Sequence, residues 1–234
     1  MKPKLLKDTE LEWSATVANN SMNRERKAFG VNSYEKEIPL NPVDFLTSRQ
    51  QQETIHWTDL CCGTGNALIQ AAAYFKEKTL SKKLSIHGID LVDHFSAYPP
   101  NSMLELSQLN LSYWNPTKKS DLITCIHGLH YIGDKLGLIL QAAAALKKDG
   151  VFIGNLDLRN IRMEGMAHSE KAILAFFKRN KIAYNKRKKI IKIEGHQLIS
   201  ATFLYVGADD KAGPNYTGQA AVNSYYKLKE DSNC

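Results

Sequence analysis

The stretch of sequence that decides the fold of this chain reads Trp57-Thr58-Asp59-Leu60-Cys61-Cys62-Gly63-Thr64-Gly65-Asn66-Ala67-Leu68. Residues 55–60 predict a buried strand, and a helix is predicted to begin at residue 66. The glycines at 63 and 65 predict a tight turn whose small side chains let a ligand approach the backbone closely. The first N–H groups of the helix would point at an anionic group of that ligand.

These residues resemble the first motif of the class I S-adenosylmethionine (SAM)-dependent methyltransferases, which reads acidic-x-Gly-x-Gly-x-Gly. The chain places Asp59, Cys61, Gly63, Gly65 and Ala67 at the motif positions. Cysteine and alanine replace two glycines there, and both are small. The resemblance covers residues 55–156 most specifically, and it implies a Rossmann-like methyltransferase.

A nicotinamide-dinucleotide enzyme is the competing interpretation of a glycine-rich turn. Its fingerprint G-x-G-x-x-[GA], started at Gly63, requires a small residue at position 68, where Leu68 stands. The turn therefore favours a methyltransferase over a dehydrogenase. A non-catalytic SAM-binding protein on the same fold stays open.

Strands and helices alternate along the chain from residue 55 onward. Strands are predicted over 55–60, 84–90, 103–109, 121–127 and 151–156, and helices over 66–76, 134–148 and 169–178. Residues 190–194 and 200–206 predict two further strands that form an antiparallel pair across a short turn. The predicted fold class is α/β: a seven-stranded, mostly parallel, doubly wound sheet with an antiparallel C-terminal strand and an N-terminal helical lid.

The N-terminal part is predicted to be separate from this pattern. Residues 1–52 are assigned to a helical extension or lid, and residues 53–234 to the methyltransferase domain. A loose helical stripe covers residues 10–22, residues 23–34 predict a loop or lid, and Asn41-Pro42 predicts a helix start. Pro99-Pro100 predicts a loop or one short turn after residue 90.

Ligands in open α/β sheets bind at the carboxyl ends of the strands, and this rule selects the candidate residues. The resemblance implies that SAM is the cofactor and S-adenosylhomocysteine (SAH) the product. An acid such as Asp90, 25 residues beyond Gly65, can accept hydrogen bonds from both ribose hydroxyls. The predicted cofactor contacts are Asp59, Cys61, Gly63, Gly65, Asp90, Asn110, Leu111 and His127, with Asn110 and Leu111 at the adenine.

Catalytic candidates are His127, His130 and Tyr34, because a histidine titrates near neutral pH and can take a proton. Alternatively, His127 is a backbone-bonded residue at a strand end and His130 caps a helix. The candidates for contact with the acceptor are Arg24, Arg26, Asn32, Tyr34 and Arg159. No metal is predicted, since no ligand spacing of a zinc or calcium site occurs.

Composition places the chain among ordinary globular proteins, with 43% hydrophobic and 24% charged residues. No stretch predicts a signal peptide or a membrane span, so we expect a soluble, cytoplasmic protein with its four cysteines as free thiols. The net charge is +7, and basic residues gather at 178–181 and 186–189, which predict either a solvated helix end and turn or a phosphate-tracking patch.

The predicted reaction is methylation of a small-molecule acceptor at nitrogen or oxygen by in-line displacement, with secondary metabolism as one setting. The alternatives are a methyltransferase acting on RNA or protein, and a non-catalytic SAM-binding protein. The acceptor, the methylated atom, the use of a general base and the oligomeric state are not determined by the sequence.

Overall fold

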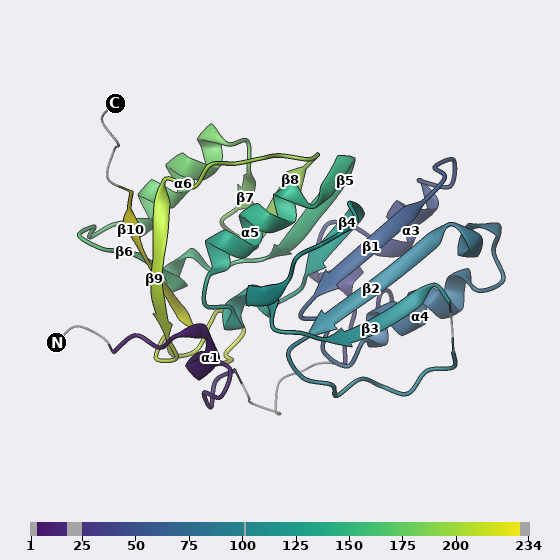
Figure 1. The fold of residues 1–234 in the computed structure, drawn as a ribbon, viewed down its shortest axis with the longest axis horizontal. Helices are drawn as coiled ribbons and strands as arrows, with labels where there is room; N and C mark the ends of the chain where they lie inside the picture. Colours follow the sequence, from purple (N-terminus) through teal and green to yellow (C-terminus); the bar gives the residue numbers. More distant parts are fainter. Residues whose placement is uncertain (1–3, 18–24, 101, 230–234) are drawn as a thin grey trace.

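The computed structural model describes residues 4–17, 25–100 and 102–229. Its centre is a seven-stranded sheet with the strand order β3-β2-β1-β4-β5-β8-β7 (Figure 1). These strands are β1 (Ile55–Leu60), β2 (Leu84–Asp90), β3 (Leu104–Gln108), β4 (Ser120–Cys125), β5 (Leu146–Asn155), β7 (Ala183–Asn185) and β8 (Ile190–Glu194). β1 to β5 pair in parallel, and β8 runs antiparallel to β5 and β7. The predicted fold class is confirmed.

Helices cover both faces of this sheet. They are α3 (Pro42–Thr47) and α4 (Asn66–Phe75) on one face, and α5 (Lys135–Ala144) and α6 (Ser169–Arg179) on the other. Neighbouring strand residues alternate between the two cores: Leu122 packs with α3 and α4, whereas Ile123 packs with α5 and α6. Strands buried on both faces explain why their sequences are almost continuously apolar.

Side-chain caps begin two of the predicted helices as the sequence indicates. Asn41 accepts hydrogen bonds from the first N–H groups of α3, and Asp134 accepts one from Gly137 of α5. The prediction that the helix of α5 extends to residue 148 is wrong, because β5 begins at Leu146 and pairs there with Ser120. Residues 91–100 form no helix or strand, as Pro99-Pro100 predicts.

The end of the chain differs from the prediction. Strand 190–194 does not pair with 200–206, because β8 is already paired on both edges, by β5 and β7. A separate three-stranded sheet instead contains β6 (Ile161–Met163), β10 (Asn223–Leu228) and β9 (Phe203–Asp209), in that order. It lies beyond α5 and beside α6, at the opposite end of the molecule from β3 (Figure 1).

The N-terminal part contains short helices, α1 (Asp8–Leu11) and α2 (Tyr34–Glu37). The longer helix predicted over 10–22 is wrong where the chain is described, since residues 12–17 form turns, and its remainder lies outside the described residues. Short 3-10 turns follow three strands: η2 (Leu111–Tyr113), η3 (Gly128–Tyr131) and η4 (Leu158–Asn160). Among the described helices, none is long and apolar enough to cross a membrane.

Candidate functional site

A cavity of about 380 Å³ opens at the carboxyl ends of β1, β2, β3 and β4, where the strand order reverses. Such reversal points are the usual ligand sites of open α/β sheets. The strand ends contribute Cys61 to Gly63, Asp90 to Val92, Leu109 to Ser112 and Ile126 to Gly128. The N-terminal part closes another side of the cavity with Asp8, Leu11, Glu12, Val17, Arg26 and Tyr34.

The turn after β1 forms the floor of this cavity. Cys61, Gly63 and Gly65 all have left-handed backbone conformations, with φ of 59°, 62° and 76°. The left-handed φ favours glycine at position 65, and a Cβ atom there would also lie 2.7 Å from Leu106 Cδ1, so that this side chain would have to shift. Asp90 lines the cavity and its Oδ2 accepts a hydrogen bond from Gly63 N at 2.8 Å. The carboxylate at the end of β2 therefore also holds the turn in shape.

Cys61 has a left-handed backbone conformation that favours glycine. Its side chain occupies the space where a side chain at Gly128 would lie. A Cβ atom at Gly128 would lie 2.4 Å from Cys61 Cβ and 2.8 Å from Cys61 Sγ. Cys125 Sγ would lie 2.9 Å away. The chain therefore accommodates a cysteine in the turn because it has no side chain at position 128.

We expect Gly128→Ala to destabilise the protein by about 1–3 kcal/mol, the usual cost of overpacking a tight site. The Cys61→Gly background should recover more than half of that cost, since it removes two of the three close atoms. Urea unfolding of the wild type, both single variants and the double variant measures the coupling. Equal costs of Gly128→Ala in both backgrounds would contradict this explanation.

Asp59 belongs to a buried network beneath the cavity. Tyr34 Oη donates to Asp59 Oδ2 at 2.6 Å, Thr124 Oγ1 donates to Asp59 Oδ1 at 2.5 Å, and Trp57 Nε1 donates to Thr124 Oγ1 at 2.8 Å. Burial raises the pKa of Asp59 to about 7, and the hydrogen bonds from Thr124 and Tyr34 oppose the rise. Asp59 does not line the cavity; its partner Tyr34 does.

This pKa predicts a pH-dependent stability. The pKa of Asp59 is about 7 in the folded protein and ordinarily 3.8, so the folded state binds the proton more tightly. The bound proton on Asp59 therefore stabilises the folded state fully below about pH 4, and this stabilisation is lost as the pH rises to about 7. The stability of Asp59→Asn relative to wild type should therefore rise over that range in urea unfolding, whereas exposed Asp93→Asn should track the wild type. Parallel profiles for Asp59→Asn and wild type would refute the prediction.

His127 lines the cavity at the end of β4 and has a left-handed backbone with φ of 60°. Its backbone N donates to Asn155 Oδ1 at 3.1 Å. Its Nε2 lies 3.0 Å from Glu37 Oε2, and Arg26 Nε lies 3.3 Å from Glu37 Oε1. The contact with His127 is the main reason why the pKa of Glu37 is lowered to about 2.

His130, the second predicted base, does not line the cavity. It is buried behind His127, with ring centroids 5.9 Å apart, and Tyr216 packs against both rings. Burial lowers the pKa of His130 to about 3, so its ring is uncharged at neutral pH and a weak base.

The other predicted residues divide between the cavity and the surface. Asn110 and Leu111 line the cavity, and the Asn110 side chain caps η2 and bonds to Glu12, the residue that follows α1. Arg26 also lines it, whereas Asn32 is exposed elsewhere and Arg24 lies outside the described residues. No periodic or motif signal in the sequence predicts that Glu12 and Tyr205 line the cavity.

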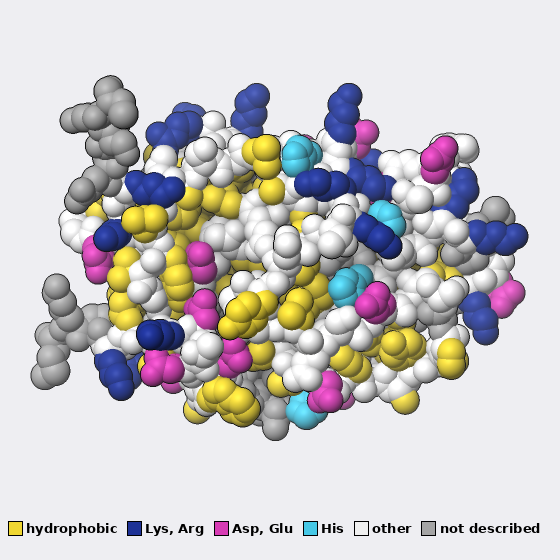
Figure 2. Space-filling view, in the orientation of Figure 1, with side chains coloured by type: hydrophobic (Ala, Val, Ile, Leu, Met, Phe, Trp, Pro, Cys, Tyr) yellow, Lys and Arg dark blue, Asp and Glu magenta, His cyan; other side chains and the backbone are white. Residues whose placement is uncertain are grey.

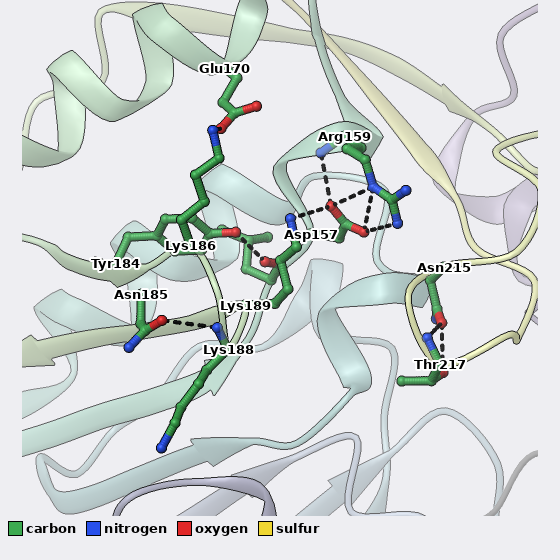
Figure 3. A network of polar contacts seen from close by, with 11 residues as sticks. Asp157, Arg159, Glu170, Tyr184, Asn185, Lys186, Lys188, Lys189, Asn215 and Thr217 are labelled. Carbon is green, nitrogen blue, oxygen red and sulfur yellow. Dashed lines mark hydrogen bonds and ion pairs between the residues drawn. The ribbon is translucent and has the colours of Figure 1, made fainter.

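Arg159 forms a pair with the buried carboxylate of Asp157 instead of lining the cavity (Figure 3). Lys189 lies 3.6 Å from the same carboxylate, and Lys186 lies 2.7 Å from Glu170. Carboxylates thus pair with two cations of the 186–189 cluster. On the face in Figure 2, Lys and Arg side chains lie along the upper edge, at both ends and on the upper part of the face, with Asp and Glu side chains between them.

Comparison with known families distinguishes a methyltransferase from a dinucleotide-dependent enzyme. A family model described as a methyltransferase domain matches residues 32–189, which is more than half of the chain and includes β1 to β5 and the turn. This chain belongs to the class I SAM-dependent methyltransferases. A comparison with curated proteins found no match.

Solved structures similar to this methyltransferase are remote. Magnesium protoporphyrin IX methyltransferase from Synechocystis PCC 6803, with bound SAM, is 16% identical, with 82% of this chain and 98% of that chain covered and a TM-score of 0.47. An amino pentose methyltransferase from Micromonospora echinaspora is 13% identical, with 66% and 58% covered and a TM-score of 0.38. The [4+2]-cyclase SpnF is 16% identical, with 48% and 43% covered and a TM-score of 0.36.

This chain spans less than two thirds of the length of the cyclase and of the amino pentose methyltransferase. All three TM-scores lie below 0.5, so no argument about the reaction or the acceptor rests on these structures.

The residues of the cavity fit the cofactor of this family, SAM. The Asp90 carboxylate can accept hydrogen bonds from a ribose diol, and the apolar side chains of Leu91 and Leu111 can contact a purine. Gly63 leaves room for close approach to the backbone of the turn. Within the described chain, no cluster of side chains could hold a metal ion.

Proposed function

We propose that this methyltransferase transfers a methyl group from SAM to a nitrogen or oxygen atom of a small-molecule acceptor. The observation that carries the proposal is the cavity, which is lined together by the cofactor-type turn, Asp90, His127 and the N-terminal part. Cavities of roughly 300–1,000 Å³ are typical of small-molecule sites. When bound, SAM supplies an activated methyl group on a sulfonium, and the protein's task is to orient the acceptor and exclude water.

Electrostatics of the cavity supports a neutral or amine-bearing acceptor. The lining includes four carboxylates, Asp8, Glu12, Asp90 and Asp134, against one guanidinium, Arg26. A phosphate-rich acceptor such as RNA would meet repulsion there. The paired lysines at 186 and 189 also leave less positive charge for a nucleic-acid backbone.

The N-terminal part is proposed to act as the lid of the site, in line with the division into residues 1–52 and 53–234. Support comes from contacts between the two parts: Tyr34 bonds to Asp59 beneath the cavity, and Glu12 bonds to the side chain of Asn110 at its lining. Leu6 also bridges to Ala208 of β9, which ties α1 to the second sheet.

The test is the effect of SAM and SAH on thermal unfolding. At 100 times its Kd, a ligand stabilises the folded state by about 2.7 kcal/mol, which should raise the Tm of a chain of this size by about 5–10 °C. Differential scanning calorimetry measures the shift, with adenosine as a fragment control. No shift at millimolar SAM and SAH would reject the proposal. If RNA were the methyl acceptor instead, its affinity for the protein would fall steeply as the salt concentration rises.

A further inference from the structure

Glu37 is the acidic residue of α2 that reaches the end of β4. Tyr34 and Glu37 stand three residues apart on this short helix, so their side chains leave it on the same side. Tyr34 is fixed by its hydrogen bond to Asp59. Glu37 is held by Arg26 on one carboxylate oxygen, at 3.3 Å, and its other oxygen lies 3.0 Å from His127 Nε2.

His127 is held in place from three directions. Asn155 accepts a hydrogen bond from its backbone N, Tyr216 and His130 pack against its ring, and Glu37 lies beside Nε2. Its left-handed backbone is unfavourable for a residue with a side chain, and such strain persists where the surrounding structure enforces it, often at functional sites.

The two ring nitrogens of His127 differ in their surroundings. Nε2 is within ion-pair distance of Glu37 but lacks the alignment of a hydrogen bond, and such bonds often tighten only when a substrate is bound. Nδ1 is buried and has no hydrogen-bond partner within the described residues, in a residue that lines the cavity, and such an unsatisfied buried nitrogen is often a catalytic group. A carboxylate beside Nε2 favours the tautomer with the proton on Nε2, which leaves the lone pair on Nδ1.

We propose that Glu37 is a positioning residue that holds the proton of His127 on Nε2, so that Nδ1 takes the proton of the acceptor. The proposal rests on the proposed function. The N–H or O–H bond of the acceptor breaks, its electron pair stays on the acceptor atom, and the proton goes to Nδ1. The acceptor atom bonds to the methyl carbon as the carbon–sulfur bond breaks, and the electron pair of that bond goes to the sulfur of SAH. The positive charge thus formed on the imidazolium lies beside the carboxylate of Glu37 and is stabilised by it.

This arrangement defines the acceptor class. A general base is required when the methyl acceptor is an alcohol, a phenol or a protonated amine. A general base has no role when the methyl acceptor carries no removable proton, as in a thioether. The acceptor therefore carries an N–H or O–H group that reaches the neighbourhood of His127.

The experiment measures the protonation of His127 and Glu37 by NMR. Samples labelled with ¹⁵N in histidine and ¹³C in the glutamate carboxyl are prepared for wild type, Glu37→Ala, Glu37→Gln and His127→Gln, with Glu35→Gln as the matched control on the same helix. The His127 and Glu37 signals are assigned by their absence from the corresponding variants. SAH binding to each sample is measured by calorimetry.

In the wild type we expect the neutral ring of His127 to carry its proton on Nε2. Glu37→Ala should mix the two tautomers, whereas Glu37→Gln, which keeps an acceptor oxygen, should retain most of the Nε2–H form. The pKa of Glu37 should rise from about 2 towards 4.5 in His127→Gln, because the main cause of its lowering is removed. Glu35→Gln should leave the His127 signals unchanged.

A proton on Nδ1 in the wild type, or His127 signals that are unchanged in Glu37→Ala, would overturn the proposal. SAH should bind wild type and Glu37→Gln within twofold, since Glu37 does not line the cavity. A tenfold weaker affinity of Glu37→Gln would assign Glu37 to cofactor binding and also overturn the proposal. Failure of SAH to bind the wild type would reject the proposed function separately from the NMR result.

Discussion

Replacing Asp90 with alanine is expected to weaken the binding of SAH by about 10- to 100-fold, which corresponds to about 1.5–3 kcal/mol for charge-assisted hydrogen bonds. The carboxylate lines the cavity at the end of β2, where the ribose hydroxyls of the cofactor would donate to it. It also accepts hydrogen bonds from Gly63 N at 2.8 Å and from Val92 N at 3.3 Å. The substitution therefore removes a ligand contact and loosens the turn beneath the ligand.

Isothermal titration calorimetry of wild type, Asp90→Ala and Asp90→Asn measures this loss. Asparagine keeps one acceptor oxygen, so Asp90→Asn should bind SAH with intermediate affinity. The matched control is Asp93→Ala, because Asp93 is exposed three residues later and does not line the cavity. An Asp90→Ala variant that is folded and binds SAH with unchanged affinity would contradict the assignment of Asp90 to the ribose.

Replacing Lys135 with methionine is expected to destabilise the protein by about 2–4 kcal/mol. Lys135 is fully buried at the start of α5, and its Nζ donates to Ile132 O, Val222 O and Ser224 Oγ at 2.8, 2.8 and 2.9 Å. Methionine has a similar shape but leaves three acceptors without a donor, at about 1 kcal/mol or more each. Val222 lies just before β10 and Ser224 lies within it, so these two hydrogen bonds of Lys135 connect the second sheet to α5.

An opposing effect limits the size of that loss. Burial lowers the pKa of Lys135 to about 7, against the influence of Asp134 and Asp209, so removing the ammonium also relieves a desolvation cost. Urea unfolding of Lys135→Met measures the net change in stability, with the exposed Lys148→Met as the control. If Lys135→Met were as stable as the wild type, relief of the buried charge would fully offset the loss of the three hydrogen bonds, and the prediction would be wrong.

Much of the central sheet could be predicted because its signals are local. The strand of β1, the turn at residues 61–65 and the helix α4 each follow from apolar spacing and small residues within a dozen positions. The caps at Asn41 and Asp134 also bind N–H groups two or three residues ahead. The second sheet could not be predicted in this way, because β10 pairs with β6 more than 60 residues earlier.

The candidate site shows the same division. Asp90, Asn110, Leu111 and His127 were predicted from their places at strand ends, and all four line the cavity. Arg159 also follows a strand, yet the buried Asp157 two residues before it holds its guanidinium away from the cavity.

By itself, the sequence determined the α/β alternation, the glycine-rich turn after β1 and the carboxylate at the end of β2, because backbone sterics and hydrogen bonding act over short distances along the chain. Only the tertiary structure decided that Glu37 lies beside His127, that Glu12 meets Asn110 and that Gly128 makes room for Cys61. These contacts join residues that are 90, 98 and 67 positions apart, and the last one depends on ångström-scale packing. Neither periodicity nor motif spacing encodes such contacts, since they arise only when the sheet brings distant strand ends together.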